Sequence, residues 1–168
     1  MIDREFYRRD VLEVAPALVG MSLVRTLPGG GERRHMITQT EAYAGEGDSA
    51  CHAHHGRGKR SEMLYHDGGT VFVYLCYGVH WMLNIVTGVI DQPQGVLIRA
   101  CEGAQGPGLL TKSLGIDGSF NGLDILSCPG LRLEGAPNSV DIITAKRVGI
   151  NYAGQIDIDR PWRFIIAR

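Results

Sequence analysis

The chain has 168 residues, of which 44% are hydrophobic and 21% charged, and its formal net charge is −1. This composition is typical of a globular protein, and a chain of this size buries about 70% of the surface that its unfolded form exposes. We therefore expect one domain over residues 1–168. No run of about 18 uncharged apolar residues indicates a membrane span, and the first residues do not resemble a signal peptide. The expected location is the cytoplasm, with nucleoid association in a bacterium and no membrane partner.

Arginine and cysteine usage narrows the class of protein further. Fourteen of the seventeen basic residues are arginines, whose planar guanidinium suits phosphate groups. Basic residues gather in residues 33–60 and 142–168, whereas residues 91–141 hold three basic and six acidic residues. The two basic ends could fold into one basic face or remain ordinary solvated surface. The four cysteines are widely spaced without a C-x-x-C pair, so no disulfide framework is expected.

The first predicted element is a short helix. Asp10 with Glu13 three residues later forms a capping-box pattern, and the helix is expected to end near Gly20. Pro16 removes a backbone hydrogen bond inside it, which predicts a break or distortion there.

Two strands follow, over residues 21–27 and 35–43, joined by a turn at residues 28–31. Side chains alternate between the two faces of a strand, so Glu41 and Tyr43 are predicted to share a face. After them, residues 44–69 form a polar connection that is longer than a passive loop needs to be.

The second half of the chain is rich in strand-like runs. Residues 70–88 predict two apolar strands around Tyr77-Gly78, and residues 95–103 predict a buried strand with Arg99 at its centre. Pro107 and Gly115 bound a predicted helix. The last strands are predicted over residues 139–150 and 161–167. This order of elements predicts a mixed α/β fold.

Glu41 is the first candidate for a functional residue. A carboxylate at the end of a neutral strand is either exposed at a sheet edge or held in a cleft, and the neighbouring Tyr43 suggests a flat ligand more than a metal. Arg99 lies inside an apolar strand and needs a partner if it is buried, and Glu41 is the expected partner. The pair could be a structural ion pair or part of a pocket.

The cluster of Cys51, His52, His54 and His55 raises the question of zinc. Zinc sites take three or four ligands at matched spacing, usually from two separated elements. Here the candidates are nearly consecutive and no second ligand pair exists, so no metal site is predicted.

Tyr77 is predicted at a hairpin tip, where a large aromatic residue has little core to enter. DNA-binding proteins use such residues to wedge between stacked bases. Glu41, Arg99, Asn84 and two or three flat side chains together suggest a pocket for a planar heterocycle, which would be stacked on its faces and hydrogen-bonded at its edge.

Several ordered motifs then resemble one known family. They are "QTEAY" ending at Tyr43, G-x-x-D-x-A-x-H from Gly45 to His52, "VYLCYG", "MLN", "VLIRA", "GPGLLTKSLGID" and "RVGINYAG" followed by "PWRF". The chain resembles the alkyladenine, or methylpurine, DNA glycosylases from about Asp10 to Phe164.

This resemblance implies a fold and an activity. The fold would be a single mixed α/β domain with a curved, mostly antiparallel sheet, surrounding helices and a β-hairpin that intercalates into DNA. The protein would flip alkylated purines, hypoxanthine or ethenoadenine out of double-stranded DNA and hydrolyse the N-glycosidic bond. It would leave an abasic site without nicking the strand, act as a monomer and need no cofactor. The motifs that supply the expected pocket residues hold no lysine, which favours water over an amine nucleophile.

The resemblance also implies roles for individual residues in the base pocket. Glu41 would be the general base and Arg99 would help to hold the attacking water. Tyr43 would stack on one face of the flipped base. The other face, the edge and the floor of the base pocket would be formed by His52, Tyr74, Asn84 and Leu97, with Asn84 disfavouring the 2-amino group of guanine.

On the DNA side, Tyr77 would fill the gap left by the flipped base. The remaining expected DNA contacts are Gly78, Arg57, Lys59 and Arg60. The chain departs from the family pattern at "GKRSE", where Ser61 replaces an asparagine, and at Phe72, where a tyrosine is frequent. These departures concern loop contacts and lesion preference rather than catalysis.

Other classes of function remain open at this point. A non-catalytic module that binds damaged DNA could share the fold, a small hydrolase could use the histidines with a metal, and a transferase could share the architecture. For a glycosylase, the activity is expected to fall at acidic pH as Glu41 is protonated. Titration of His52 is expected to add a second step to the pH–rate profile near neutral pH.

Overall fold

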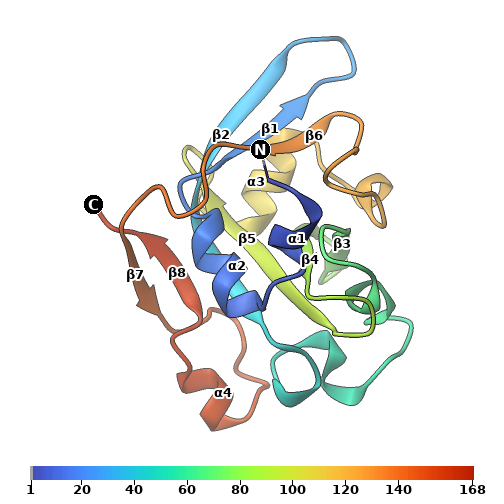
Figure 1. The fold of residues 1–168 in the computed structure, drawn as a ribbon, viewed down its shortest axis with the longest axis vertical. Helices are drawn as coiled ribbons and strands as arrows, with labels where there is room; N and C mark the ends of the chain where they lie inside the picture. The colour runs from blue at the N-terminus through green and yellow to red at the C-terminus, as the bar shows by residue number, and fades with distance from the viewer. Residues whose placement is uncertain (1) are drawn as a thin grey trace.

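The longest strand, β2 (Glu32–Tyr43), carries Glu41 near its end and joins two parts of the sheet. In the computed structural model, which describes residues 2–168, its first half pairs with β1 (Ser22–Thr26). Its second half pairs with β5 (Gln94–Cys101) and with β8 (Arg163–Ile166). Register shifts between Ile37 and Thr40 mark a β-bulge where the partners change, and such a bulge bends a strand. The sheet curls around this point (Figure 1).

The remaining strands extend the sheet on both sides of β2. β3 (Val71–Cys76) and β4 (His80–Thr87) form a hairpin next to β5, β6 (Leu131–Glu134) pairs with β1, and β7 (Ile142–Ala145) pairs with β8. The order is β3-β4-β5-β2-β1-β6, with β8 and β7 branching from β2, and the pairings are antiparallel. The predicted curved, mostly antiparallel sheet in a mixed α/β domain is confirmed.

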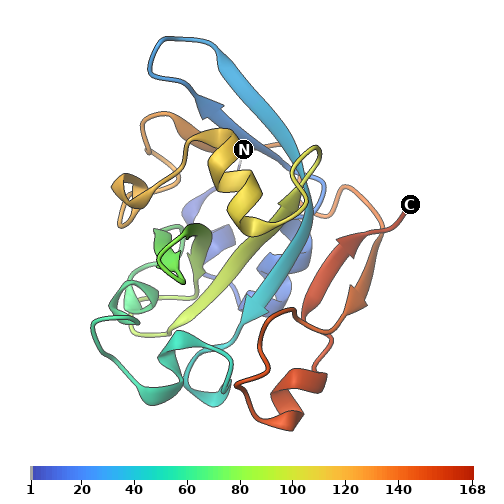
Figure 2. The ribbon, with the colours of Figure 1, turned by 180° about the vertical axis from the view of Figure 1, so that it is seen from behind.

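Helices cover both faces of this sheet. α1 (Arg4–Tyr7) and α2 (Val11–Leu18) lie on one face, and α3 (Pro107–Leu114) lies on the other (Figures 1 and 2). α4 (Gln155–Asp159) lies between β7 and β8 in the chain. Within residues 2–168, no helix has the length and apolarity needed to cross a membrane.

The helix ends follow local sequence signals in part. The Asp10 side chain accepts from the Leu12 N–H at 2.8 Å and caps α2, as predicted, whereas Glu13 pairs with Arg9 instead of closing a capping box. α2 continues through Pro16 to Leu18, so the helix does not break at Pro16, and it ends close to the predicted Gly20. α3 begins at Pro107 and ends at Leu114, and its C-cap residue Gly115 has a φ of +61°, the left-handed conformation that glycine tolerates.

Two loop regions differ from the predicted elements. The polar connection after β2 contains three short 3-10 helices, η1 (Gly45–Gly47), η2 (His52–His55) and η3 (Glu62–Tyr65). The strand predicted over residues 139–150 is limited to β7, and residues 146–150 form a loop. This correction matters because the loop enters the site described below. Its backbone N–H groups are not used in strand pairing, so they can donate to side chains of the site.

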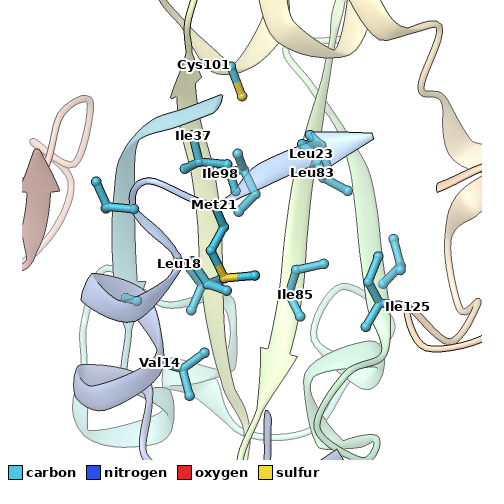
Figure 3. Close-up of a cluster of buried hydrophobic side chains, with 14 of the residues drawn as sticks. Val14, Leu18, Met21, Leu23, Ile37, Leu83, Ile85, Ile98, Cys101 and Ile125 are labelled. Carbon is cyan, nitrogen blue, oxygen red and sulfur yellow. The ribbon is translucent and has the colours of Figure 1, made fainter. Parts of the chain in front are cut away.

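The core packs α1, α2 and α3 against the sheet. Its labelled side chains in Figure 3 come from α2, β1, β2, β4 and β5, together with Met21 before β1 and Ile125 in the loop after η4 (Gly118–Phe120). A second, smaller cluster lies under the polar connection and contains Cys51, Ala53, Leu64, Tyr65, Phe72 and Val86. It supports the segment that carries His52.

Candidate active site

Glu41 is fully buried at the end of β2, between Leu97 of β5 and Arg163 of β8. The Tyr43 hydroxyl donates to its Oε2 at 2.7 Å, and the Val148 N–H donates to its Oε1 at 2.9 Å. The Arg99 Nε lies 3.4 Å from the same Oε1. Two hydrogen-bond donors and one ion-pair partner, from three parts of the chain, therefore fix the orientation of this carboxylate. The expected Glu41–Arg99 pair and the shared face of Glu41 and Tyr43 are both present.

Tyr43 keeps its proton in this environment. Burial, the charge of Glu41 and the hydrogen bond between them raise the pKa of Tyr43 well above the usual value for a tyrosine. The hydroxyl therefore acts as a donor to the carboxylate over the whole physiological range of pH.

A cleft of about 570 Å³, within the size range of small-molecule sites, lies next to the groups that surround this carboxylate, and Glu41 itself is not among its lining residues. The three groups that contact Glu41 line it: Tyr43, Arg99 and Val148. Its other lining residues include predicted site residues from several elements, namely His52, Tyr74, Leu97, Tyr77 and Arg60. A narrower pocket opens from the same aromatic walls and reaches Asn84.

The aromatic walls pack closely on one another. The rings of His52 and Tyr74 have centroids 4.5 Å apart, and Phe72 lies 5.1 Å from Tyr74. Burial raises the pKa of Tyr74 above its usual value, so its hydroxyl is neutral. The stack presents flat, uncharged surfaces to the cleft, which suits a planar ligand.

His52 is also neutral at physiological pH. Burial, followed by the positive charge of Arg60, lowers the pKa of His52 below 6.5. Its Nδ1 is buried without a hydrogen-bond partner among residues 2–168. We therefore expect any change in activity caused by protonation of His52 at a lower pH than the near-neutral value predicted from the sequence.

Asn84 is a fixed polar group in the pocket. Its side chain is buried, and its Nδ2 donates to the carbonyl oxygens of Phe72 and Met82, each at 3.2 Å. These bonds hold the amide plane in place and leave Oδ1 as the atom that can meet a ligand.

The hairpin tip stands at the mouth of the cleft. Tyr77 is 91% exposed with a φ of +52°, and Gly78 follows with a φ of +66°. The predicted exposed tip is confirmed. Its insertion into DNA stays a prediction.

The basic residues predicted to contact DNA do not share one environment. Arg60 lines the cleft, and Lys59 makes no ion pair within the described part of the chain. Arg57 instead pairs with Glu62 and Asp91 and lies over the Tyr65 ring, in a different hollow. Arg57 therefore does not line the cleft with Arg60, and its charge is already paired within the protein.

The histidine cluster is spread over the rim of the cleft. His54 and His55 lie side by side with centroids 4.9 Å apart, and the Nδ1 of His54 bonds the Glu46 carbonyl at 3.0 Å. Across residues 2–168, no three His, Cys, Asp or Glu side chains are grouped as metal ligands.

Four residues of the site were missed by the sequence analysis: Asp48, Arg147, Val148 and Tyr152. Tyr152 lines both the cleft and the narrower pocket, and its hydroxyl donates to the Ala50 carbonyl at 2.7 Å. Arg147 and Asp48 form a buried ion pair behind Tyr43. The available signal was their place inside two of the quoted motifs, G-x-x-D and "RVGINYAG".

Known proteins of one family resemble this chain over nearly its whole length. The family model described as "Methylpurine-DNA glycosylase (MPG)" matches residues 5–105 and 102–168. Relatives that carry the name "Putative 3-methyladenine DNA glycosylase" include a protein of Borreliella burgdorferi that is 39% identical over 181 aligned residues, covering 98% of this chain and 95% of the relative. Those of Natranaerobius thermophilus and Methanocella arvoryzae are 39% and 38% identical, cover 98% of this chain, and are covered over 94% and 91% of their own length. The chain therefore belongs to the methylpurine-DNA glycosylase family, a family of base-excision DNA-repair enzymes.

Proposed function

We propose that this protein is a monofunctional DNA glycosylase that acts as a monomer on double-stranded DNA. It flips a damaged purine into the cleft and hydrolyses the N-glycosidic bond, leaving an abasic site. The substrates are alkylated purines, hypoxanthine and ethenoadenine. The observation that carries the proposal is the buried Glu41 carboxylate, which is held by hydrogen bonds from Tyr43 and Val148 and by an ion pair with Arg99. These three residues line an aromatic cleft.

The chemistry requires one base and a good leaving group. Glu41 accepts a proton from water as the water oxygen bonds to C1′ of the flipped nucleotide. The C1′–N bond breaks through an oxocarbenium-like sugar, and the bonding electrons leave with the purine. A purine alkylated at N3 or N7 is already cationic and leaves as a neutral base, so a second strong acid is less necessary. Hypoxanthine and ethenoadenine are neutral in DNA and leave as anions, which take up a proton from water.

The pocket supports binding of the flipped base. Tyr43, His52 and Tyr74 offer neutral aromatic surfaces for stacking, which is how base-flipping enzymes hold an extruded base. We assign the fixed amide of Asn84 to discrimination against the 2-amino group of guanine, and Leu97 to the floor. No lysine lines either hollow among residues 2–168, which supports water as the nucleophile and argues against strand nicking.

We assign Tyr77 and Gly78, at the exposed hairpin tip, to the gap that the flipped base leaves in the duplex. Its position at the mouth of the cleft supports this assignment, because the displaced base and the wedge must lie close together. Lys59 and Arg60 are assigned to the phosphate backbone, with Arg57 in a lesser role because its charge is already paired.

The test is single-turnover excision on a labelled duplex that carries one hypoxanthine, with and without an alkali step. Wild type is expected to release the base and to give strand breaks only after alkali. Glu41→Gln is expected to lower the rate by about 100-fold or more, since a positioned general base contributes about 10²- to 10⁴-fold, while lesion binding persists.

Glu46→Gln is the matched control, because Glu46 also accepts a tyrosine hydroxyl at 2.7 Å but lies outside both hollows. It is expected to react at the wild-type rate. Full activity in Glu41→Gln would reject Glu41 as the base. Lesion binding by wild type without excision of hypoxanthine, 3-methyladenine or ethenoadenine would identify a non-catalytic binding module.

A further inference from the structure

Arg147 and Asp48 form an ion pair with no exposed side-chain surface, directly behind the cleft. The guanidinium donates to both carboxylate oxygens, with NH1 to Oδ2 at 2.6 Å and NH2 to Oδ1 at 2.9 Å. The two residues are 99 positions apart in the sequence. A bidentate pair of this kind adds geometric definition as well as energy, because the planar fork accepts only one orientation of the carboxylate.

Each partner of the pair also holds backbone groups near the site. Arg147 NH1 donates to the Ala42 carbonyl at 2.9 Å, which lies between Glu41 and Tyr43 in β2. Asp48 accepts from the N–H groups of Ala44 and Ala50 at 3.0 and 3.1 Å. The pair therefore ties together the end of β2, the loop that leads to His52, and the loop after β7.

The guanidinium of Arg147 also stacks against the residue that would hold the base. Its Cζ lies 4.9 Å from the centroid of the Tyr43 ring and 5.0 Å from that of Trp162. Arg147 itself does not line the cleft. It acts on the site only through its neighbours.

Those neighbours are the two hydrogen-bond donors to Glu41. Val148 follows Arg147 in the chain and donates its N–H to Oε1, and Tyr43 donates its hydroxyl to Oε2. One guanidinium therefore sets the position of both donors relative to the carboxylate. A buried ion pair is weak evidence for stability in itself, because the cost of removing two charges from water offsets their attraction, so a positional role explains the pair better than a stabilising one.

We infer that Arg147 is a positioning residue for the reaction, which holds Tyr43 and the Val148 N–H against Glu41 while Asp48 holds Arg147. This inference rests on the proposed function. It assigns Arg147 and Asp48 to the rate of the chemical step rather than to the affinity for DNA, since neither side chain lines the cleft. Small displacements of catalytic groups are costly, and about 1 Å can lower a rate about 100-fold.

The test compares two arginine-to-lysine substitutions in the full-length protein. Arg147→Lys keeps the charge but loses the two-pronged contact and the stacking. Arg25→Lys is the matched control, because Arg25 is also buried, lies over the Phe120 ring at 4.8 Å and bonds the Gly130 carbonyl, but is on β1 outside the cleft. Single-turnover excision at saturating enzyme, affinity for lesion DNA and the thermal unfolding midpoint are measured for each.

Arg147→Lys is expected to lower the excision rate by about 10- to 100-fold with less than about a threefold change in affinity, in line with the sensitivity of rates to misplacement. Arg25→Lys is expected to change both by less than about threefold while lowering the unfolding midpoint similarly. Equal rates in the two variants overturn the inference, and so does a fall in rate and affinity together. If wild type itself excises no lesion, the proposed function fails and the inference fails with it.

A second variant keeps the inference testable if Arg147→Lys does not fold. Arg147→Met combined with Asp48→Asn removes both charges, so that no unpaired charge is left buried. It is expected to fold and to lose at least about 10-fold in excision rate. Failure of both variants to fold would assign the pair to stability and overturn the inference.

Discussion

At the scale of single residues, the chain contains two tyrosine–glutamate hydrogen bonds of the same length in different settings. Tyr43 donates to Glu41 and Tyr65 donates to Glu46, each at 2.7 Å. The first contact lies at the proposed catalytic carboxylate, whereas Tyr65 belongs to the smaller hydrophobic cluster and lies outside the cleft. The same chemical change can therefore be made inside and outside the site.

Tyr43→Phe is expected to lower the single-turnover excision rate by about 10-fold or more, since a hydrogen bond to a charged group contributes about 1.5–3 kcal/mol. The ring is retained, so stacking and lesion affinity are expected to change little. Tyr65→Phe is expected to leave the rate unchanged. Equal effects of the two substitutions would show that the hydroxyl of Tyr43 has no special role.

His52 sets an expectation for pH. Because burial and Arg60 lower its pKa below 6.5, the folded state binds fewer protons at His52 than the unfolded state between the folded pKa and about 6.5. Stability from this residue is therefore complete above about pH 6.5 and is lost as the pH falls through the folded pKa. NMR titration of His52 is expected to give a value below 6.5, and Arg60→Gln is expected to raise it. A value at or above 6.5 in wild type would contradict this account.

At the scale of elements, the β3–β4 hairpin keeps a residue that its turn does not favour. Tyr77 and Gly78 both have positive φ, as in a type I′ turn, for which Asn-Gly is strongly preferred. Tyr77 is exposed, so packing does not explain its presence either. Neither turn geometry nor packing therefore accounts for the tyrosine, which is consistent with its proposed contact with DNA.

Tyr77→Asn is expected to stabilise the free protein by about 1 kcal/mol, because asparagine adopts positive φ at lower cost. For a chain of this size that corresponds to an increase of roughly 2–4 °C in the unfolding midpoint. The same change is expected to lower excision from duplex DNA, whereas Tyr77→Phe is expected to preserve it. An active Tyr77→Asn variant would argue against the wedge.

At the scale of the whole molecule, the net charge of −1 gives no attraction to DNA, so binding depends on where the charges lie. Much of the predicted basic surface is neutralised within the protein. Arg57 pairs with Glu62 and Asp91, Lys146 pairs with Asp159, and Arg147 is buried against Asp48. Arg60 at the cleft is in no ion pair among residues 2–168. Ion pairs within the protein therefore neutralise part of both basic segments.

Binding of undamaged duplex at several salt concentrations distinguishes these arginines. Each phosphate contact contributes about 0.9 to the slope of log affinity against log salt concentration. Arg60→Gln is expected to reduce the slope by about one contact, and Arg57→Gln by much less, because its charge is already paired. A larger effect of Arg57→Gln would mean that its ion pairs open on binding DNA.

Local patterns in the sequence were enough to predict the features that depend on a few neighbouring residues. The alternation that places Glu41 beside Tyr43, the hairpin tip at Tyr77 and the Pro107–Gly115 boundaries of α3 each follow from the geometry of one element. The family resemblance added the order of the motifs and the curved sheet. The sequence by itself therefore determined the class of fold, the family and several of the cleft-lining residues, among them Tyr43, Tyr74 and Arg99.

Only the tertiary structure decided how distant segments meet. The loop of residues 146–150 reads as a strand because its local composition is strand-like, yet it turns to place the Val148 N–H on Glu41, 107 positions away. Likewise, nothing local distinguishes Arg147, which is buried against Asp48, from Arg57, which is paired on the surface. The physical reason is that burial and ion pairing depend on which elements pack together, and that is settled by the whole curled sheet rather than by the residues on either side.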